Sequence, residues 1–343
     1  MQSGEDFNRY IDAFGKKLEI IEIDRLNETN YCNRYLKHIL QHQRYYLAIY
    51  ADVLNKLIWN SKKKKEDILL VDIGSGNGLL GIFAKFCGFK KVVLNDLDKT
   101  FIEASEKLAT QLNIKLDAYI TGDIDAVQNY FSQEQPDSVV GTDVIEHIYD
   151  LEIFFKTLQQ INPSIVSVFT TASNPSNPFK VRQLQKIQVR DELKGGSPGD
   201  HQLFGETTLE PFVTIREKII REFEQGLTEN EILKLSTLTR GLVKADIISV
   251  VEKYKSDRIL PVNTAGGTNT CNPMNGSWTE RLLSLDTYIS LYASAGFTCD
   301  FYAGFYNDHE KGMKNFVKKL LNALGRVFGK KISPYIVIVG HKI

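Results

Sequence analysis

The stretch Val71-Asp72-Ile73-Gly74-Ser75-Gly76-Asn77-Gly78-Leu79-Leu80-Gly81 decides the fold of this chain. It continues an apolar run, rich in branched side chains, that begins at Ile68 and is typical of a strand buried on both faces of a parallel sheet. It leads into an apolar segment, 79–86, that predicts a helix. Between strand and helix, Gly74 and Gly76 allow a sharp turn and the close approach of a ligand, because a Cβ atom would collide there. The unpaired N–H groups at the start of the helix would then face a carboxylate or phosphate of that ligand.

Strands and helices alternate along the chain after this stretch. Further strands are predicted over 91–95, 118–120, 138–141 and 165–170, and helices over 100–111 and 151–160. A helix over 285–295, a strand over 297–305, an amphipathic helix over 313–328 and a strand over 335–339 follow near the end. The alternation implies right-handed crossovers and predicts an α/β fold with a doubly wound, mostly parallel seven-stranded sheet.

Four segments are expected along the chain. Residues 1–65 predict a helical N-terminal cap, which ends in the solvated lysine run 62–65. Residues 66–175 contain the strands and helices of the α/β core. The alternation stops over 176–281, which is loop-rich and helical and is interpreted as an insertion that encloses the substrate. Residues 282–343 return to the core with its last strands.

Composition narrows the classes of function. Lys+Arg and Asp+Glu balance at 42 each, so no overall field attracts nucleic acid or an anionic membrane. The four cysteines form no C-x-x-C pair, which argues against a zinc knuckle or a redox motif. Charged residues interrupt every apolar run in the first 20 positions, so these positions lack a signal-peptide pattern. No apolar stretch approaches the roughly 20 residues that span a bilayer. We expect a cytoplasmic protein with no membrane partner and no nucleic-acid partner.

Two cofactors compete for the glycine stretch. A dinucleotide site has the spacing G-x-G-x-x-G, which the glycines after Gly76 do not keep. The pattern here is acidic-x-G-x-G-x-G, with Asp72 at the end of the strand. It resembles the first motif of class I S-adenosylmethionine-dependent methyltransferases, which have a Rossmann-like fold. The resemblance implies that Asp72, Gly74 and Gly76 hold the methionine part of S-adenosylmethionine.

The resemblance continues at the ends of the next three strands. It implies that Asp96 binds the ribose hydroxyls, since two carboxylate oxygens suit a vicinal diol, although Asp98 competes for this role. It also implies an acid, Asp123, against the adenine amino group, and places Thr142 beside the transferable methyl. The expected cofactor-binding residues are Asp72, Gly74, Ser75, Gly76, Asn77, Asp96, Leu97, Asp123, Ile124 and Thr142.

The segment Thr142-Asp143-Val144-Ile145-Glu146-His147 carries a second resemblance. It is similar to the E/D-x-x-E-H pattern of the ubiquinone-biosynthesis O-methyltransferases and of small-RNA 2′-O-methyltransferases. This implies that Asp143, Glu146 and His147, with His201 as a second histidine, bind Mg²⁺ or another divalent metal that lowers a hydroxyl's pKa. Two alternatives stay open: His147 is a general base without metal, or Glu146 caps a helix and His147 shapes the pocket. The candidate catalytic residues are His147, Asp143 and His201.

Three functions follow from these patterns. The neutral charge and the large insertion favour a methyltransferase that O-methylates a small molecule or a glycan precursor. A metal-dependent RNA 2′-O-methyltransferase is the enzymatic alternative, and a non-catalytic methyltransferase-like binding module is the third. The N-terminal tyrosines are interpreted as core packing rather than as a stacking platform; they are Tyr31, Tyr35, Tyr45, Tyr46 and Tyr50. Neither the acceptor nor the oligomeric state is specified by the sequence.

Overall fold

The computed structural model describes residues 5–26, 30–196, 210–309 and 312–342. The chain folds into two compact units. Unit 1 comprises residues 1–145, 150–172 and 284–343, and unit 2 comprises residues 146–149 and 173–283. The predicted N-terminal cap is therefore part of unit 1, and the predicted insertion lies within unit 2.

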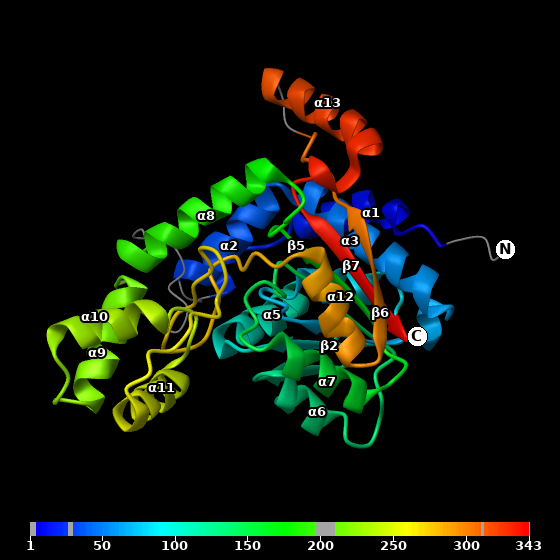
Figure 1. The fold of residues 1–343 in the computed structure, drawn as a ribbon. Coiled ribbons are helices and arrows are strands. Elements are labelled where there is room, and N and C mark those ends of the chain that lie inside the picture. The colour runs from blue at the N-terminus through cyan, green and yellow to red at the C-terminus, as the bar shows by residue number, and fades with distance from the viewer. Residues whose placement is uncertain (1–4, 27–29, 197–209, 310–311, 343) are drawn as a thin grey trace. The chain divides into compact units, whose positions relative to one another are not determined.

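The described residues of unit 1 build a seven-stranded sheet in the order β3-β2-β1-β4-β5-β7-β6 (Figure 1). Its strands are β1 (Leu69–Ile73), β2 (Lys91–Asp96), β3 (Ala118–Thr121), β4 (Ser138–Thr142), β5 (Val166–Thr171), β6 (Phe297–Ala303) and β7 (Ile336–Lys342). The first five strands run parallel, whereas β7 is antiparallel to both β5 and β6. The sheet confirms the predicted doubly wound, mostly parallel class I methyltransferase fold. The chain winds outward through β2 and β3 and then returns to β4, so the carboxyl ends of β1 and β4 form the switch point where such sheets bind ligands.

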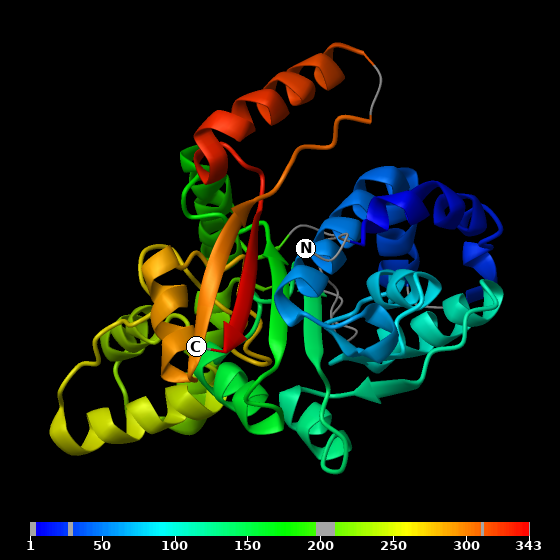
Figure 2. The ribbon, with the colours of Figure 1, turned by 90° about the vertical axis from the view of Figure 1, so that its right-hand side faces the viewer.

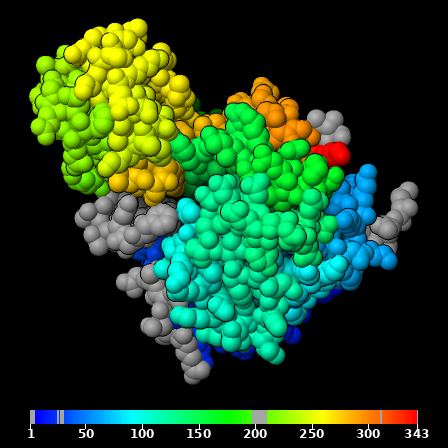
Figure 3. Space-filling model, turned by 90° about the horizontal axis from the view of Figure 1, so that it is seen from below, coloured from blue at the N-terminus to red at the C-terminus, as the bar shows by residue number. Residues whose placement is uncertain are grey.

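Helices cover both faces of this sheet. In unit 1 they are η1 (Phe7–Tyr10), α1 (Ile11–Leu18), η2 (Ile23–Leu26), α2 (Asn30–Gln41), α3 (Gln43–Ser61), η3 (Lys65–Asp67), α4 (Leu79–Phe86), α5 (Lys99–Gln111), α6 (Ile124–Tyr130), α7 (Leu151–Ile161), α12 (Leu285–Ser294), α13 (Met313–Phe328) and η5 (Gly329–Lys331). The sequence did not predict α6, which is short. Figure 3 views unit 1 from a side on which α6 and α7, coloured teal and green, lie at the surface.

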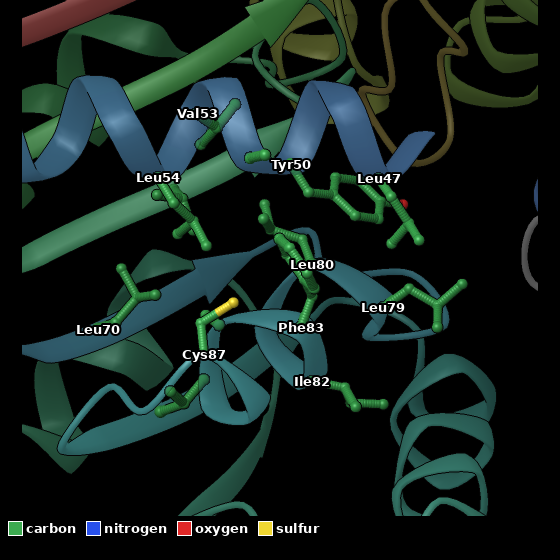
Figure 4. Packing of buried hydrophobic residues seen from close by; sticks show 14 of the residues in the cluster. Leu47, Tyr50, Val53, Leu54, Leu70, Leu79, Leu80, Ile82, Phe83 and Cys87 are labelled. Carbon is green, nitrogen blue, oxygen red and sulfur yellow. The ribbon is translucent and has the colours of Figure 1, made fainter. Parts of the chain in front are cut away.

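Alternate strand residues pack against different helices, as the pleat requires. Leu70, Val140 and Val168 join the core that α3 and α4 form on one face. Figure 4 shows Leu47 and Leu54 of α3 on the side that faces the sheet and α4. On the other face, Phe169 of β5 contacts Phe154 of α7, and Phe155 lies against Tyr292 of α12. The central strands β1, β4 and β5 are buried along almost their whole length because helices cover both faces of the sheet there.

Unit 2 has its own hydrophobic core. Its helices are α8 (Pro178–Leu193), α9 (Phe212–Phe223), α10 (Glu229–Leu238) and α11 (Lys244–Asp257). The last three pack around a shared set of side chains: Ile219, Ile220, Ile232, Leu235, Ile247, Val251 and Tyr254. Beside this core, Arg216 of α9 forms a buried ion pair with Glu192 of α8, and the Arg216 Nε donates to Ser236 O at 2.7 Å.

None of the helices within the described residues is both long enough and apolar enough to cross a membrane.

Candidate functional site

The glycine loop (residues 74–78) joins β1 to α4 at the switch point of the sheet. Gly74, Gly76 and Gly78 all have positive φ angles, of 61°, 51° and 74°. A Cβ on Gly74 would overlap the side chain of Val144, and one on Gly76 would lie 3.3 Å from Cε1 of Tyr35. The positive φ angles confirm the predicted sharp turn, and the side chains of Val144 and Tyr35 leave little room for a Cβ at Gly74 and Gly76.

Asp72 lies beneath this loop and is directed into the protein. Its side chain is 1% exposed, and its Oδ2 accepts a hydrogen bond of 2.9 Å from the backbone N–H of Gly81. Gly81 is in the first turn of α4, where backbone N–H groups have no partner within the helix. Burial raises the pKa of Asp72 to about 8, although the Gly81 hydrogen bond lowers it. Asp72 thus positions the start of α4 relative to β1.

Asp96 ends β2 and supports the glycine loop from the neighbouring strand. Its Oδ2 accepts from Gly76 N at 2.8 Å, and its Oδ1 accepts from Asp98 N at 2.9 Å. Burial raises its pKa to about 6, and the two backbone hydrogen bonds act in the opposite direction. Asp98, the competing acid, caps α5, because its Oδ1 accepts from Thr100 N and Thr100 Oγ1, each at 2.8 Å. Asp96 is therefore the acid that faces the glycine loop, and the adjacent Leu97 is 53% exposed.

Two buried polar residues that the sequence did not single out hold the same loop. The backbone oxygen of Asn95 accepts from Ser75 N of the loop at 2.9 Å, while the Asn95 side chain donates to Gly122 O, after β3, at 2.8 Å. From α5, the hydroxyl of Ser105 donates to Gly76 O at 2.9 Å. A buried polar group at the end of an apolar strand must find a hydrogen-bond partner, and this was the signal available for Asn95.

Other predicted cofactor residues have structural partners. Asn77 is buried, and its Nδ2 donates to Cys32 O of α2 at 3.3 Å. The Asp123 carboxylate caps α6 by accepting from Asp125 N at 3.1 Å and from Ala126 N at 3.4 Å. Ile124 is the first residue of that helix.

Asp143 follows Thr142 at the carboxyl end of β4 in a rarely used backbone conformation. Its φ angle is 52°, and its N–H donates to Thr170 O at 3.1 Å. Its Oδ1 accepts from Ala172 N at 3.2 Å. An unusual backbone angle at the switch point of the sheet is a feature of functional sites.

Three phenols from the N-terminal helices lie within electrostatic reach of Asp143. This tyrosine cluster consists of Tyr35, Tyr45 and Tyr46. Burial raises the pKa of all three phenols, that of Tyr46 to about 12, and the charge of Asp143 is the next largest cause in each case. The Tyr45 hydroxyl donates to Phe305 O at 3.1 Å. All three tyrosines pack against the hydrophobic core of unit 1, which confirms the predicted core packing, and the charge of the acid that follows β4 also acts on their phenols.

Glu146 and His147 belong to unit 2. His147 Nδ1 lies 2.7 Å from Trp278 O, while the Trp278 and Arg281 N–H groups donate to His147 O at 3.3 Å and to Glu146 O at 3.2 Å. A carbonyl oxygen only accepts, so Nδ1 carries a proton, and in the neutral imidazole the lone pair is on Nε2. Within the described ranges, no three His, Cys, Asp or Glu side chains are grouped to hold a metal ion. His201 lies outside the described residues.

Comparison with known proteins finds similarity to methyltransferases. Residues 71–162 match the family model of the methyltransferase domain. This segment is therefore similar to a methyltransferase domain over about a quarter of the chain. The matched residues include the glycine loop, Asp96 and Asp143. The match ends at residue 162, directly after α7.

More distant similarities extend over different lengths. The chain is 33% identical over 85 residues to the ribosomal protein L11 methyltransferase of Acinetobacter baumannii (strain AYE), a match that covers 25% of this chain and 28% of that protein. It thus spans less than a third of the curated relative's length. An S-adenosylmethionine-dependent methyltransferase structure from Mesorhizobium loti aligns over 84% of this chain and 98% of that one, with 11% identity and a TM-score of 0.41. A Clostridium acetobutylicum structure of the same description aligns over 85% and 89%, with 10% identity and a TM-score of 0.42.

Proposed function

We propose that this chain is an S-adenosylmethionine-dependent methyltransferase that O-methylates a small molecule or a glycan precursor. The observation that supports it most is the Asp96 carboxylate, which holds the Gly76 N–H at the carboxyl end of β2. A carboxylate offers about four lone-pair positions, so Asp96 can fix the loop and still accept hydrogen bonds from both ribose hydroxyls.

The residues around Asp96 suit the rest of this cofactor. Gly74 and Gly76 allow the left-handed turn that places the loop backbone at the carboxyl end of β1, beside Asp96. The exposed Leu97 offers an apolar surface for the adenine ring. S-adenosylmethionine supplies an electrophilic methyl group on a positively charged sulfonium. The Asp143 carboxylate and the π-faces of the tyrosine cluster provide the negative charge and polarisable surface that favour such a cation.

Each unit by itself offers candidate groups for the acceptor, which are the phenols of the tyrosine cluster in unit 1 and the His147 imidazole in unit 2. Phenols are neutral at physiological pH, so the Tyr35 and Tyr46 hydroxyls can donate hydrogen bonds to oxygen atoms of the acceptor, whereas Tyr45 donates to Phe305 O. His147 is the candidate general base, because its hydrogen bond to Trp278 O leaves the Nε2 lone pair available for the proton of an acceptor hydroxyl. Direct proton transfer to Nε2 needs no metal ion, and Asp143, Glu146, His147 and His201 are not required to meet around one.

Calorimetry tests the cofactor site. Asp96→Ala removes the proposed acceptor for the ribose hydroxyls, and hydrogen bonds to a charged group are worth about 1.5–3 kcal/mol. We expect S-adenosylhomocysteine to bind about tenfold or more weakly to this variant. The matched control is Asp117→Ala, because the Asp117 carboxylate accepts from Val92 N at 2.8 Å at the opposite end of the same strand. If both variants lose affinity to the same extent, Asp96 has no specific role in binding the cofactor.

A cofactor analogue separates contact from loop support. If Asp96 binds the ribose directly, a 2′-deoxyribose analogue of S-adenosylhomocysteine should lose less affinity on Asp96→Ala than the parent ligand does. An identical loss for both ligands would mean that Asp96 acts only by holding Gly76. Failure of the wild-type protein to bind S-adenosylhomocysteine would favour the non-catalytic binding module.

A second experiment distinguishes the general base from a metal site. His147→Asn keeps a side-chain N–H that can donate to Trp278 O but lacks Nε2, so the rate should fall by about 10²–10⁴ while S-adenosylhomocysteine affinity stays unchanged. Isotope-labelled methyl transfer to a panel of monosaccharides and simple phenols provides the rate. The wild-type rate should be the same with and without a chelator. A chelator-sensitive rate that Mg²⁺ restores would refute the metal-free mechanism.

A further inference from the structure

Helix α13 (Met313–Phe328) has an apolar face that is largely exposed in the described part of unit 1. With about 100° of rotation per residue, its apolar side chains occupy one continuous arc of about 160°. Seven of them are 38–85% exposed: Met313, Phe316, Val317, Leu320, Leu324, Val327 and Phe328. The helix has no buried residue. In Figures 1 and 2 it projects beyond the end of the sheet at which β6 ends and β7 begins.

The opposite, polar face holds α13 to the rest of unit 1. Asn322 Oδ1 accepts from Tyr306 N at 2.7 Å, and Asn322 Nδ2 donates to Tyr306 O at 3.0 Å. Asn322 lies roughly half a turn away from the centre of the apolar arc. The amide pair therefore directs the apolar face away from the sheet. Phe305, next to Tyr306, accepts the hydrogen bond of Tyr45, so one segment contacts both α13 and the tyrosine cluster.

The charge on this helix is entirely positive. Residues 313–331 contain no Asp or Glu, although the whole chain has 42 acids and 42 Lys+Arg. The cations are Lys314, Lys318, Lys319, Arg326, Lys330 and Lys331. On the helix they lie on the polar side, and Lys314 and Lys319 are at the two borders of the apolar arc. Long cationic side chains at such a border extend toward anionic groups while their stems cover apolar surface.

We propose that α13 binds the surface of an anionic phospholipid bilayer. Apolar side chains between rows of cations suit the boundary between acyl chains and anionic headgroups, and a helix of about 24 Å lies in this plane and does not span the bilayer. Electrostatic attraction adds to apolar burial on such a surface. A second copy of the helix fits less well, because pairing two apolar faces would bring like charges together with no acid on either helix. The proposal revises the expectation that the chain has no membrane partner.

Vesicle flotation tests this surface with the full-length protein. Wild type should bind vesicles of phosphatidylcholine and phosphatidylglycerol in equal parts, should bind phosphatidylcholine vesicles about tenfold less, and should dissociate as salt increases. Phe316→Asp with Leu320→Asp should lower partitioning to the anionic vesicles by about tenfold or more. Lys319→Glu with Arg326→Glu, which keeps the apolar face intact, should lower it to a similar extent.

The control variant replaces two exposed apolar residues by Asp on helices other than α13. Ile153→Asp with Leu233→Asp replaces exposed apolar residues of α7 and α10, 57% and 55% exposed, and should leave partitioning unchanged. Unaltered circular dichroism and S-adenosylhomocysteine affinity in each variant would show that the fold is retained. The proposal fails if wild type does not bind anionic vesicles, or if the α13 variants bind as well as wild type does. A dimer that Phe316→Asp with Leu320→Asp dissociates, without vesicle binding, would assign the face to a second copy.

Discussion

Asp72 and Asp96 are carboxylic acids on adjacent strands, and burial changes their ionisation to different extents. Burial raises the pKa of Asp72 to about 8 and that of Asp96 to about 6. Asp96 accepts two backbone hydrogen bonds from Gly76 and Asp98, whereas Asp72 accepts one from Gly81. Hydrogen bonds to the charged form favour it, so the better-solvated acid with more donors ionises more readily. Around neutral pH the ligand-free protein therefore carries its negative charge at Asp96 and keeps Asp72 largely protonated.

This difference predicts a dependence of stability on pH. A carboxyl with a raised pKa binds its proton more tightly in the folded state, so the free energy of unfolding falls as pH rises from about 4 to about 8, by at most about 1.4 kcal/mol per pH unit. Asp72→Asn, whose amide oxygen can still accept from Gly81 N, should remove this loss. Urea unfolding at several pH values measures it. Asp96→Asn should change the pH dependence of the unfolding free energy only below about pH 6. If Asp72→Asn leaves that dependence unchanged above pH 6, the raised pKa of Asp72 is wrong.

At the scale of elements, the strands could be predicted and the directions of many site side chains could not. β1, β4 and β5 are almost wholly buried because the sheet is covered on both faces, and their branched apolar residues indicated this burial in the sequence. The acidic-x-G-x-G-x-G pattern located the glycine loop, yet it carries no information on where a carboxylate points. Asp72 faces α4 and Asp123 caps α6, so their roles toward the cofactor stay predictions.

Long-range contacts account for the rest of what the sequence could not provide. The tyrosines of α2 and α3 have helical spacing, which predicts a buried face but not that β4 ends beside them with Asp143. Ser105 holds the glycine loop across 29 residues of sequence, and no local pattern marks such a pair. In the sequence, the Asp-x-x-Glu-His pattern after β4 is a single motif. In the structure, Asp143 belongs to unit 1, whereas Glu146 and His147 belong to unit 2.

At the scale of the whole molecule, the two units have separate means of stabilisation. Unit 1 contains the large core that joins the sheet to α3 and α4, and unit 2 contains a smaller core of α9, α10 and α11. In unit 2 the Arg216–Glu192 ion pair is buried, and Glu192 Oε2 also accepts from Thr270 Oγ1 at 2.8 Å. Removing one partner of a buried pair leaves a desolvated charge, which costs about 3–5 kcal/mol. Unit 2 should therefore be sensitive to Arg216 in a way that unit 1 is not.

The two tryptophans allow this prediction to be measured unit by unit. Trp59 of unit 1 is 84% exposed and Trp278 of unit 2 is 4% exposed, so Trp59→Phe leaves Trp278 as the fluorescent reporter of unit 2. In this background, Arg216→Met should move the Trp278 unfolding transition to lower urea concentration. The circular dichroism of the sheet and the affinity for S-adenosylhomocysteine should persist beyond it. Adding Glu192→Gln, which removes the unpaired charge but keeps an acceptor for Thr270, should restore most of the lost stability. If fluorescence and circular dichroism instead change together, the two units unfold as one, because the loss of the smaller core then destabilises the sheet as well.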